Sequence, residues 1–224
     1  MFKTIFQDVI MEIKNLVPHL FIEDIMSEES RDYLLKFIKE EKVISKARGG
    51  TQIIKKENVQ DVEVLNILNS LVLYFEQDLF CFFSEYLPLK IVEIENRTDR
   101  TISVFNTAVY GPFISICEPG HFINAHRDDF FQFVICIIYL GHLDNTPAQT
   151  TSILNGKDIL AANCESDIVH TGCFDNIERI NFGYSKNAAL FFLNNDYAYH
   201  MVDNPIEKNR VTVMFSIEVK LNES

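Results

Sequence analysis

The strongest constraint on the fold is a run near the C-terminus in which apolar and polar residues alternate. Its apolar members are Val211, Val213, Phe215, Ile217 and Val219. The residues between them are Arg210, Thr212, Met214 and Ser216. Because successive side chains of a β-strand point to opposite faces, this period of two predicts a long strand with two chemically different faces.

The chain upstream of this run has the texture of an antiparallel β-protein. From Lys90 onward, short β-rich runs alternate with Asn, Gly and Asp, and they cover 91–95, 102–110, 113–117, 132–140, 152–154 and 188–193. Several short strands at this spacing are typical of a sandwich or a barrel. The long polar stretch 155–181 is interpreted as an insertion near the mouth of that barrel.

The first 88 residues follow a helical period instead. Apolar residues recur at helical spacing over 2–13, after the capping segment 27–30, and over about 62–86. A polar loop at 46–61 carries Gly49-Gly50 and is a candidate lid. We therefore expect an α+β protein with a single domain over 1–224, in which a helical part (1–88) precedes a β core (89–224).

Charge and composition argue against several classes of partner. The 224 residues include 20 basic and 32 acidic side chains, for a formal net charge of −12. Such a surface repels nucleic acids and anionic membranes. The longest apolar run, 133–140, falls far short of the ~20 residues of a membrane helix. A start without an apolar signal segment, and five cysteines without a C-x-x-C pair, predict a cytoplasmic protein with reduced thiols.

The residues that could carry chemistry begin with His126-Arg127-Asp128. In a strand-like segment His126 and Asp128 project to the same side, and a second histidine would complete the 2-His-1-carboxylate triad of non-haem Fe(II) sites. The triplet alone is weak, because a solvent-facing histidine beside a capping aspartate fits it equally well. Downstream, however, His200 follows the apolar run 188–193, and Arg210 comes ten residues later.

Together these residues resemble the 2-oxoglutarate- and Fe(II)-dependent oxygenases of the prolyl-hydroxylase-like type. The resemblance covers about residues 88–220 and rests on 117–128, 138–140, His200 and Arg210-Val211-Thr212. It implies a double-stranded β-helix (jelly-roll) core of antiparallel strands, with N-terminal helices packed on one face. It also implies that His126, Asp128 and His200 bind iron and that O2 is a co-substrate. The 2-oxoglutarate site that it implies is formed by Arg210, Tyr139 and Thr212.

The implied clamp makes physical sense for a dicarboxylate. The guanidinium of Arg210 offers a bidentate fork that an ammonium group does not. Thr212 shares the strand face of Arg210, so its hydroxyl can join the clamp, and Tyr139 adds a neutral donor. The chain departs from the family pattern at Cys117, where a tyrosine is common, and at 149–154, which lacks the Gly-Gly pair of many members.

Other residues compete for these roles. His170 with Arg179 has a similar spacing, but no long alternating strand follows Arg179. His121 is expected in a loop that precedes the site. Arg127 and Asn124 are candidate substrate contacts, although Arg127 would point away from the metal-binding face of a regular strand.

The resemblance implies an enzyme that oxidises its substrate and releases succinate and CO2. Asp128 favours hydroxylation, desaturation or ring closure, since halogenating relatives carry a small residue at this place. Ser216 stands where the nucleic-acid demethylases carry a second arginine. We therefore expect a small-molecule substrate, such as an amino acid or a metabolite derived from one, and the net charge favours a neutral or cationic one. The alternatives are a protein or peptide hydroxylase of the same class, a non-catalytic cupin-like metal-binding barrel, and a pseudoenzyme with the same fold.

Overall fold

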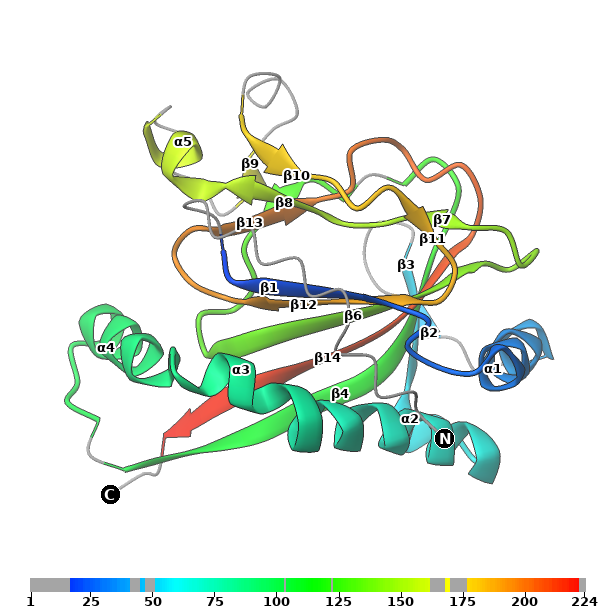
Figure 1. Ribbon diagram of the computed structural model, residues 1–224, viewed down its shortest axis with the longest axis horizontal. Helices are drawn as coiled ribbons and strands as arrows, with labels where there is room; N and C mark the ends of the chain where they lie inside the picture. Colours follow the sequence, from blue (N-terminus) through cyan, green and yellow to red (C-terminus); the bar gives the residue numbers. More distant parts are fainter. Residues whose placement is uncertain are drawn as a thin grey trace.

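Two facing β-sheets form the core of the molecule (Figure 1). The computed structural model describes residues 17–40, 45–46, 51–102, 104–121, 123–161, 168–169 and 177–221. The larger sheet has the strand order β1 (His19–Glu23), β12 (Ala188–Leu193), β6 (Gln132–His142), β14 (Arg210–Leu221), β4 (Phe105–Cys117), β3 (Thr51–Lys55) and β2 (Ser45–Lys46). The smaller sheet has the order β10 (Arg179–Ile180), β8 (Ser152–Asn155), β13 (Ala198–Met201), β5 (Ala125–His126) and β9 (Ile168–Val169). A short ladder of β7 (Ala148–Gln149) and β11 (Tyr184–Ser185) completes the double-stranded β-helix, which confirms the predicted fold class.

Strand β14 lies at the centre of the larger sheet and has the two faces that its sequence predicts. It pairs antiparallel with β4 on one side and with β6 on the other, and Thr212 lies opposite both Ser115 and Tyr139. Register places Phe192 of β12 on the same face as Tyr139, and the Phe192 ring lies 5.0 Å from that of His200 in the smaller sheet. The polar face of β14 is therefore the inner face of the jelly roll.

Helices cover the outer face of the larger sheet (Figure 1). Helix α2 (Val62–Tyr74), the π-helical segment η2 (Phe75–Leu79) and α3 (Phe80–Ser84) follow one another across it, and Asp61 caps α2 by accepting a hydrogen bond from the Val64 amide at 3.0 Å. The buried Phe75 ring stacks on Phe191 of β12 at 5.4 Å and meets Phe215 of β14 edge-on at 5.9 Å. The remaining helices are α1 (Glu28–Glu40), η1 (Lys56–Asn58), α4 (Leu87–Thr98) and α5 (Gly156–Ala161).

The junction between the helical and β parts differs from the prediction. Residues 91–95, predicted as a strand, lie within α4. Pro88 occupies the first turn of this helix, where its missing amide hydrogen is not needed, so it begins a helix instead of ending the helical part. Helix α4 continues to Thr98, and a single strand, β4, runs from Phe105 to Cys117 where two separate strands, 102–110 and 113–117, were predicted.

The larger sheet also contains strands that the sequence did not predict. The segment 46–61, predicted as a loop, contains β3, which pairs with β4 over its whole length. Strand β1 pairs with β12 at the opposite edge. Strand β1 is an edge strand, and β3 is separated from the other edge only by the two-residue strand β2. Both β1 and β3 are only partly buried, so they lack the clean apolar period that identifies a central strand.

Several predictions fall outside the described residues. They concern the helix over 2–13, the Gly49-Gly50 lid, His170, and the parts of 155–181 that cover 162–167 and 170–176. Among the helices that the structure describes, none is both long enough and apolar enough to cross a membrane.

Candidate metal centre

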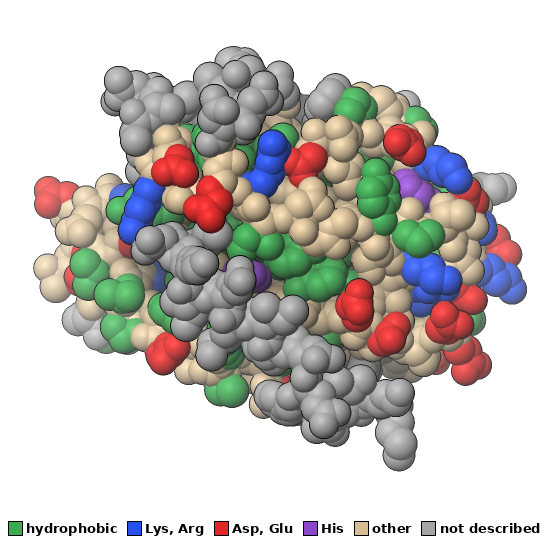
Figure 2. All heavy atoms as spheres, turned by 45° about the horizontal axis from the view of Figure 1, so that its top comes forward, with side chains coloured by type: hydrophobic (Ala, Val, Ile, Leu, Met, Phe, Trp, Pro, Cys, Tyr) green, Lys and Arg blue, Asp and Glu red, His purple; other side chains and the backbone are tan. Residues whose placement is uncertain are grey.

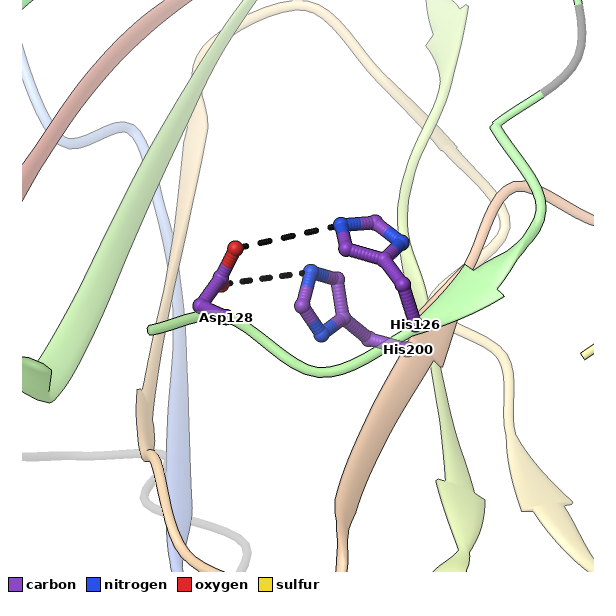
Figure 3. A group of neighbouring side chains, drawn as sticks. All are labelled: His126, Asp128 and His200. Carbon is purple, nitrogen blue, oxygen red and sulfur yellow. Dashed lines mark ion pairs between the residues drawn. The ribbon is translucent and has the colours of Figure 1, made fainter. Parts of the chain in front are cut away.

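Two histidines and one aspartate converge between the sheets (Figure 3). His126 on β5 and His200 on β13 lie directly opposite each other in register, and their ring centres are 4.2 Å apart. Asp128 follows β5 in a loop, with Oδ1 3.8 Å from Nε2 of His126 and Oδ2 3.5 Å from Nε2 of His200. One ligand atom of each residue lies within 4.8 Å of the others, so the three could hold a single first-row metal ion.

The hydrogen bonds of the two histidines leave Nε2, the nitrogen that faces Asp128, free to bind a metal ion. Nδ1 of His126 lies 2.7 Å from the carbonyl oxygen of Asn124, and Nδ1 of His200 lies 3.4 Å from that of Ala198. A carbonyl oxygen can only accept, so Nδ1 carries the proton in both rings and the lone pair on Nε2 faces Asp128. Burial, reinforced by the neighbouring His126, lowers the pKa of His200 to about 4 against the opposing effect of Asp128. His200 is therefore a neutral imidazole at neutral pH.

Arg210 lies buried at the start of β14, on the inner face of the larger sheet. Its Nε donates to the carbonyl oxygen of Gln149 at 2.8 Å, and Nη2 donates to Oγ1 of Thr151 at 3.2 Å. Its side chain is 3 % exposed, and no carboxylate of the described residues forms an ion pair with it. A buried cation without a counter-ion is costly, so this position is suited to an anionic ligand.

Two neutral hydroxyl groups lie on the same inner face of the sheet as this guanidinium. Tyr139, whose ring centre is 5.3 Å from the guanidinium carbon of Arg210, accepts a hydrogen bond from the Thr151 amide at 3.0 Å. Burial raises the pKa of Tyr139 even though Arg210 opposes the shift, so its hydroxyl keeps its proton. Thr212 is 1 % exposed, and its Oγ1 has no hydrogen-bond partner among the described residues. These donors fit a carboxylate, which would supply the missing acceptor.

Of the two predicted substrate contacts, Arg127 has side-chain partners within the protein. Nη1 of Arg127 donates to the carbonyl oxygen of Asp196 at 3.2 Å and to its Oδ1 at 3.1 Å, and the guanidinium lies 5.1 Å from the Tyr199 ring centre. Asn124 contacts His126 through its backbone carbonyl. The structure thus directs Arg127 toward the connection between β12 and β13, and its predicted role in substrate binding stays a prediction.

An open pocket of about 400 Å³ borders Asp128 on the side of α4. Its lining includes Arg97 of α4 and, after β5, Asp129 and Phe130. The guanidinium of Arg97 is paired with Asp196, and Asp129 is exposed. The pocket therefore combines an aromatic surface with a carboxylate that is open to solvent.

The sequence did not identify the residues that orient the predicted site residues Arg210 and Arg127. Gln149 and Thr151 orient Arg210, and Asp196 holds Arg127. No spacing in the sequence identifies them, because each acts through a contact between segments that are 59 to 69 residues apart. The signal that the sequence does contain is the position of 149–151 as a polar run directly before the buried strand β8.

The comparison with solved structures agrees with this fold, whereas the other comparisons found no match. No family model and no curated protein matches the chain. Among solved structures, a prolyl hydroxylase from Trichoplax adhaerens, in complex with a hypoxia inducible factor peptide fragment, matches with a TM-score of 0.54 at 11% identity. That match covers 89% of this chain and 83% of the other.

Two further structures match in the same way. HygX from Streptomyces hygroscopicus, with nickel and 2-oxoglutarate bound, has a TM-score of 0.53 at 10% identity and covers 91% and 84% of the two chains. SnoN, a non-heme alpha ketoglutarate dependent epimerase from nogalamycin biosynthesis, has a TM-score of 0.52 at 6% identity and covers 92% and 81%. The chain thus has the fold of 2-oxoglutarate/Fe(II) oxygenases.

The hydroxyl of Thr212, which has no hydrogen-bond partner in the part of the chain that the structure describes, predicts an unusual effect on stability. In the ligand-free protein, Thr212→Val should leave the free energy of unfolding unchanged or raise it, because no hydrogen bond is lost. The matched control is Thr150→Val, whose buried hydroxyl donates to the Gly183 carbonyl at 3.0 Å. That control should lower the free energy of unfolding in urea by about 1–3 kcal/mol. Equal losses in the two variants would show that Thr212 has an internal partner after all.

Proposed function

We propose that this chain is an Fe(II)- and 2-oxoglutarate-dependent dioxygenase. In this proposal His126, Asp128 and His200 hold the iron, and Arg210, Tyr139 and Thr212 hold the distal carboxylate of 2-oxoglutarate. The observation that carries it is the combination of a converging His–Asp–His set with a buried arginine that has no carboxylate partner among the described residues. A barrel that only stores a metal, such as a cupin-like binding protein, has no use for such an arginine.

Each residue has a distinct task in the proposed reaction. Bound iron and 2-oxoglutarate, with O2, would supply the oxidising power and release succinate and CO2. The protein contributes orientation: the Nδ1 protons of both histidines are fixed by backbone carbonyls, so both Nε2 atoms face the metal position. The guanidinium of Arg210 neutralises the far end of the dicarboxylate, and the hydroxyls of Tyr139 and Thr212 donate to it.

We further propose that residues 1–224 form one oxygenase domain that works in the cytosol. The larger sheet recruits β1 and β3 from the first part of the chain, which supports a shared core. Cys81, Cys117 and Cys136 are free thiols, as expected in a reducing compartment.

The proposed substrate is a neutral or cationic small molecule, such as an amino acid or a metabolite derived from one. The pocket beside Asp128 has the size of a small-molecule site. Its two arginines, Arg97 and Arg127, are both paired with Asp196, whereas Asp129 is exposed and available to a cation. On the face shown in Figure 2, the described acidic and basic side chains are interspersed and form no extended basic patch.

The iron and co-substrate sites predict a spectroscopic signature. Anaerobic addition of Fe(II) and 2-oxoglutarate to the protein should produce a weak visible metal-to-ligand charge-transfer band, because the keto acid would chelate iron directly. Replacing 2-oxoglutarate with succinate, which has no keto group, is the control and should give no band. A protein that binds Fe(II) without developing the band with 2-oxoglutarate would contradict the proposal.

Removal of Arg210 should separate co-substrate binding from metal binding. Arg210→Ala is expected to raise the apparent 2-oxoglutarate requirement roughly 30-fold or more, since loss of one partner of a buried charged contact costs about 2–5 kcal/mol. The affinity for Mn(II), a redox-stable substitute for Fe(II), should change little. Arg179→Ala, which removes a guanidinium paired with Asp203, is the control and should leave the requirement unchanged. An unchanged requirement in Arg210→Ala would assign the carboxylate clamp to other residues.

A substrate screen tests the proposed substrate class. Free amino acids, amines and neutral metabolites should be compared with peptides for stimulation of succinate formation above the uncoupled rate. We expect stimulation by a small neutral or cationic compound. Stimulation confined to peptides or to anionic metabolites would overturn the substrate class and leave the oxygenase proposal intact.

A further inference from the structure

The aspartate of the candidate metal centre lies outside regular secondary structure. His126 and His200 are fixed to each other by the direct pairing of β5 with β13. Asp128 has no such support, because β5 ends at His126 and β6 begins only at Gln132. Its position therefore depends on whatever holds the segment between these strands, 127–131, in place.

Arg127, the residue between the candidate ligands His126 and Asp128, makes the first contact that holds this segment. It donates to both the backbone carbonyl and the carboxylate of Asp196, and its guanidinium covers the ring of Tyr199. Asp196 precedes β13, and Tyr199 is the neighbour of His200. Arg127 thus joins the segment that carries His126 and Asp128, which is β5 with the loop after it, to the segment around β13 that carries His200.

A second contact holds the other side of Asp128. Nδ2 of the buried Asn194 donates to the carbonyl oxygens of Asp129 at 2.7 Å and Gln132 at 3.0 Å. The connection between β12 and β13, residues 194–197, therefore holds 127–131 at both ends. Two anchor points restrict the loop far more than one, because a single contact would still allow it to rotate.

Helix α4 contacts the same connection. Arg97 donates to the Asp196 carboxylate that Arg127 also contacts. The buried Lys90 donates to the carbonyl oxygen of Asn194 at 2.7 Å and to Glu93 at 3.2 Å. Asp196 thus has one basic partner that faces the metal loop and another that faces the helix, and this allows the two roles to be separated by mutation.

We propose that Arg127 is a positioning residue that fixes Asp128 relative to His200 through its contact with Asp196. The inference rests on the proposed metal site and assigns Arg127 a role beyond ligation and substrate contact. Metal ligands must be held close to their binding geometry, and a loop that is already ordered avoids the entropy cost of being ordered by the metal. Residues that hydrogen-bond directly to metal ligands typically contribute about 10- to 100-fold to metal affinity. Arg127 acts through the backbone that carries the ligand, so we expect its contribution at the lower end of this range.

The test is a titration of the metal-free protein with Mn(II), followed by the loss of the electron paramagnetic resonance signal of free Mn(II). Arg127→Gln should weaken Mn(II) binding about 10-fold or more. Asp196→Asn should weaken it less, because the backbone carbonyl of Asp196 remains. Arg97→Gln is the matched control: it removes the helix-side partner of the same carboxylate and should leave the affinity within about twofold of the wild type. Arg127→Lys, which keeps the charge, should recover part of the loss.

The outcomes separate the inference from the proposed function. If the wild-type protein binds no Mn(II), the proposed metal site fails. If it binds Mn(II) and Arg127→Gln binds equally well, only the positioning role is overturned. A loss of affinity in Arg97→Gln as large as that in Arg127→Gln would also overturn it, because the effect would then follow general stability. If Arg127→Gln does not fold, Asp196→Asn decides, and wild-type affinity in that variant overturns the inference.

Discussion

The pairing of β14 between β4 and β6 is the interaction on which the rest of the structure depends. It gives the larger sheet its centre, and it fixes which residues of β14 face inward. Val211, Val213 and Phe215 then form part of the apolar core, and Phe215 meets Phe75 of the helical layer. The same alternation directs Arg210 and Thr212 into the interior of the barrel. A shift of the register by one residue would instead have placed their side chains on the outer face, against the helices.

This arrangement explains how an acidic protein can be suited to an acidic ligand. The net charge of −12 is spread over the surface, and salt screens its repulsion of an anion beyond about 8 Å at physiological ionic strength. Arg210 acts at contact distance and in a buried setting, where a charge interacts far more strongly than at the surface. In the proposed function, the surface charge would therefore bear on the choice of substrate, whereas the interior of the barrel would determine the affinity for the co-substrate.

The fold and the central residues of the site could be predicted because both depend on local patterns. The alternation over 210–219 identified β14, and the order H-x-D followed by a distant His identified the three side chains that converge in space, His126, Asp128 and His200. Helix α4 was missed because Pro88 is compatible with both the end of one helix and the start of the next. Strands β1 and β3 were missed because a partly buried strand at or next to the edge of a sheet is identified by the strand it pairs with more than by its own sequence. The contacts of Arg127 and Arg210 could not be predicted, since Asp196 and Gln149 reach them only through the completed fold.

The shortness of β5 has a consequence for the stability of the smaller sheet. This strand contains only two residues, and its pairing with β13 consists of the single register pair His126–His200. A metal ion bound by both histidines would tie the two strands together at that pair. Because a ligand that binds only the folded form stabilises it by mass action, metal loading and closure of the smaller sheet would be a single linked equilibrium. The concentration of free metal in the cell would then determine both how much of the protein is active and how much of it resists local opening.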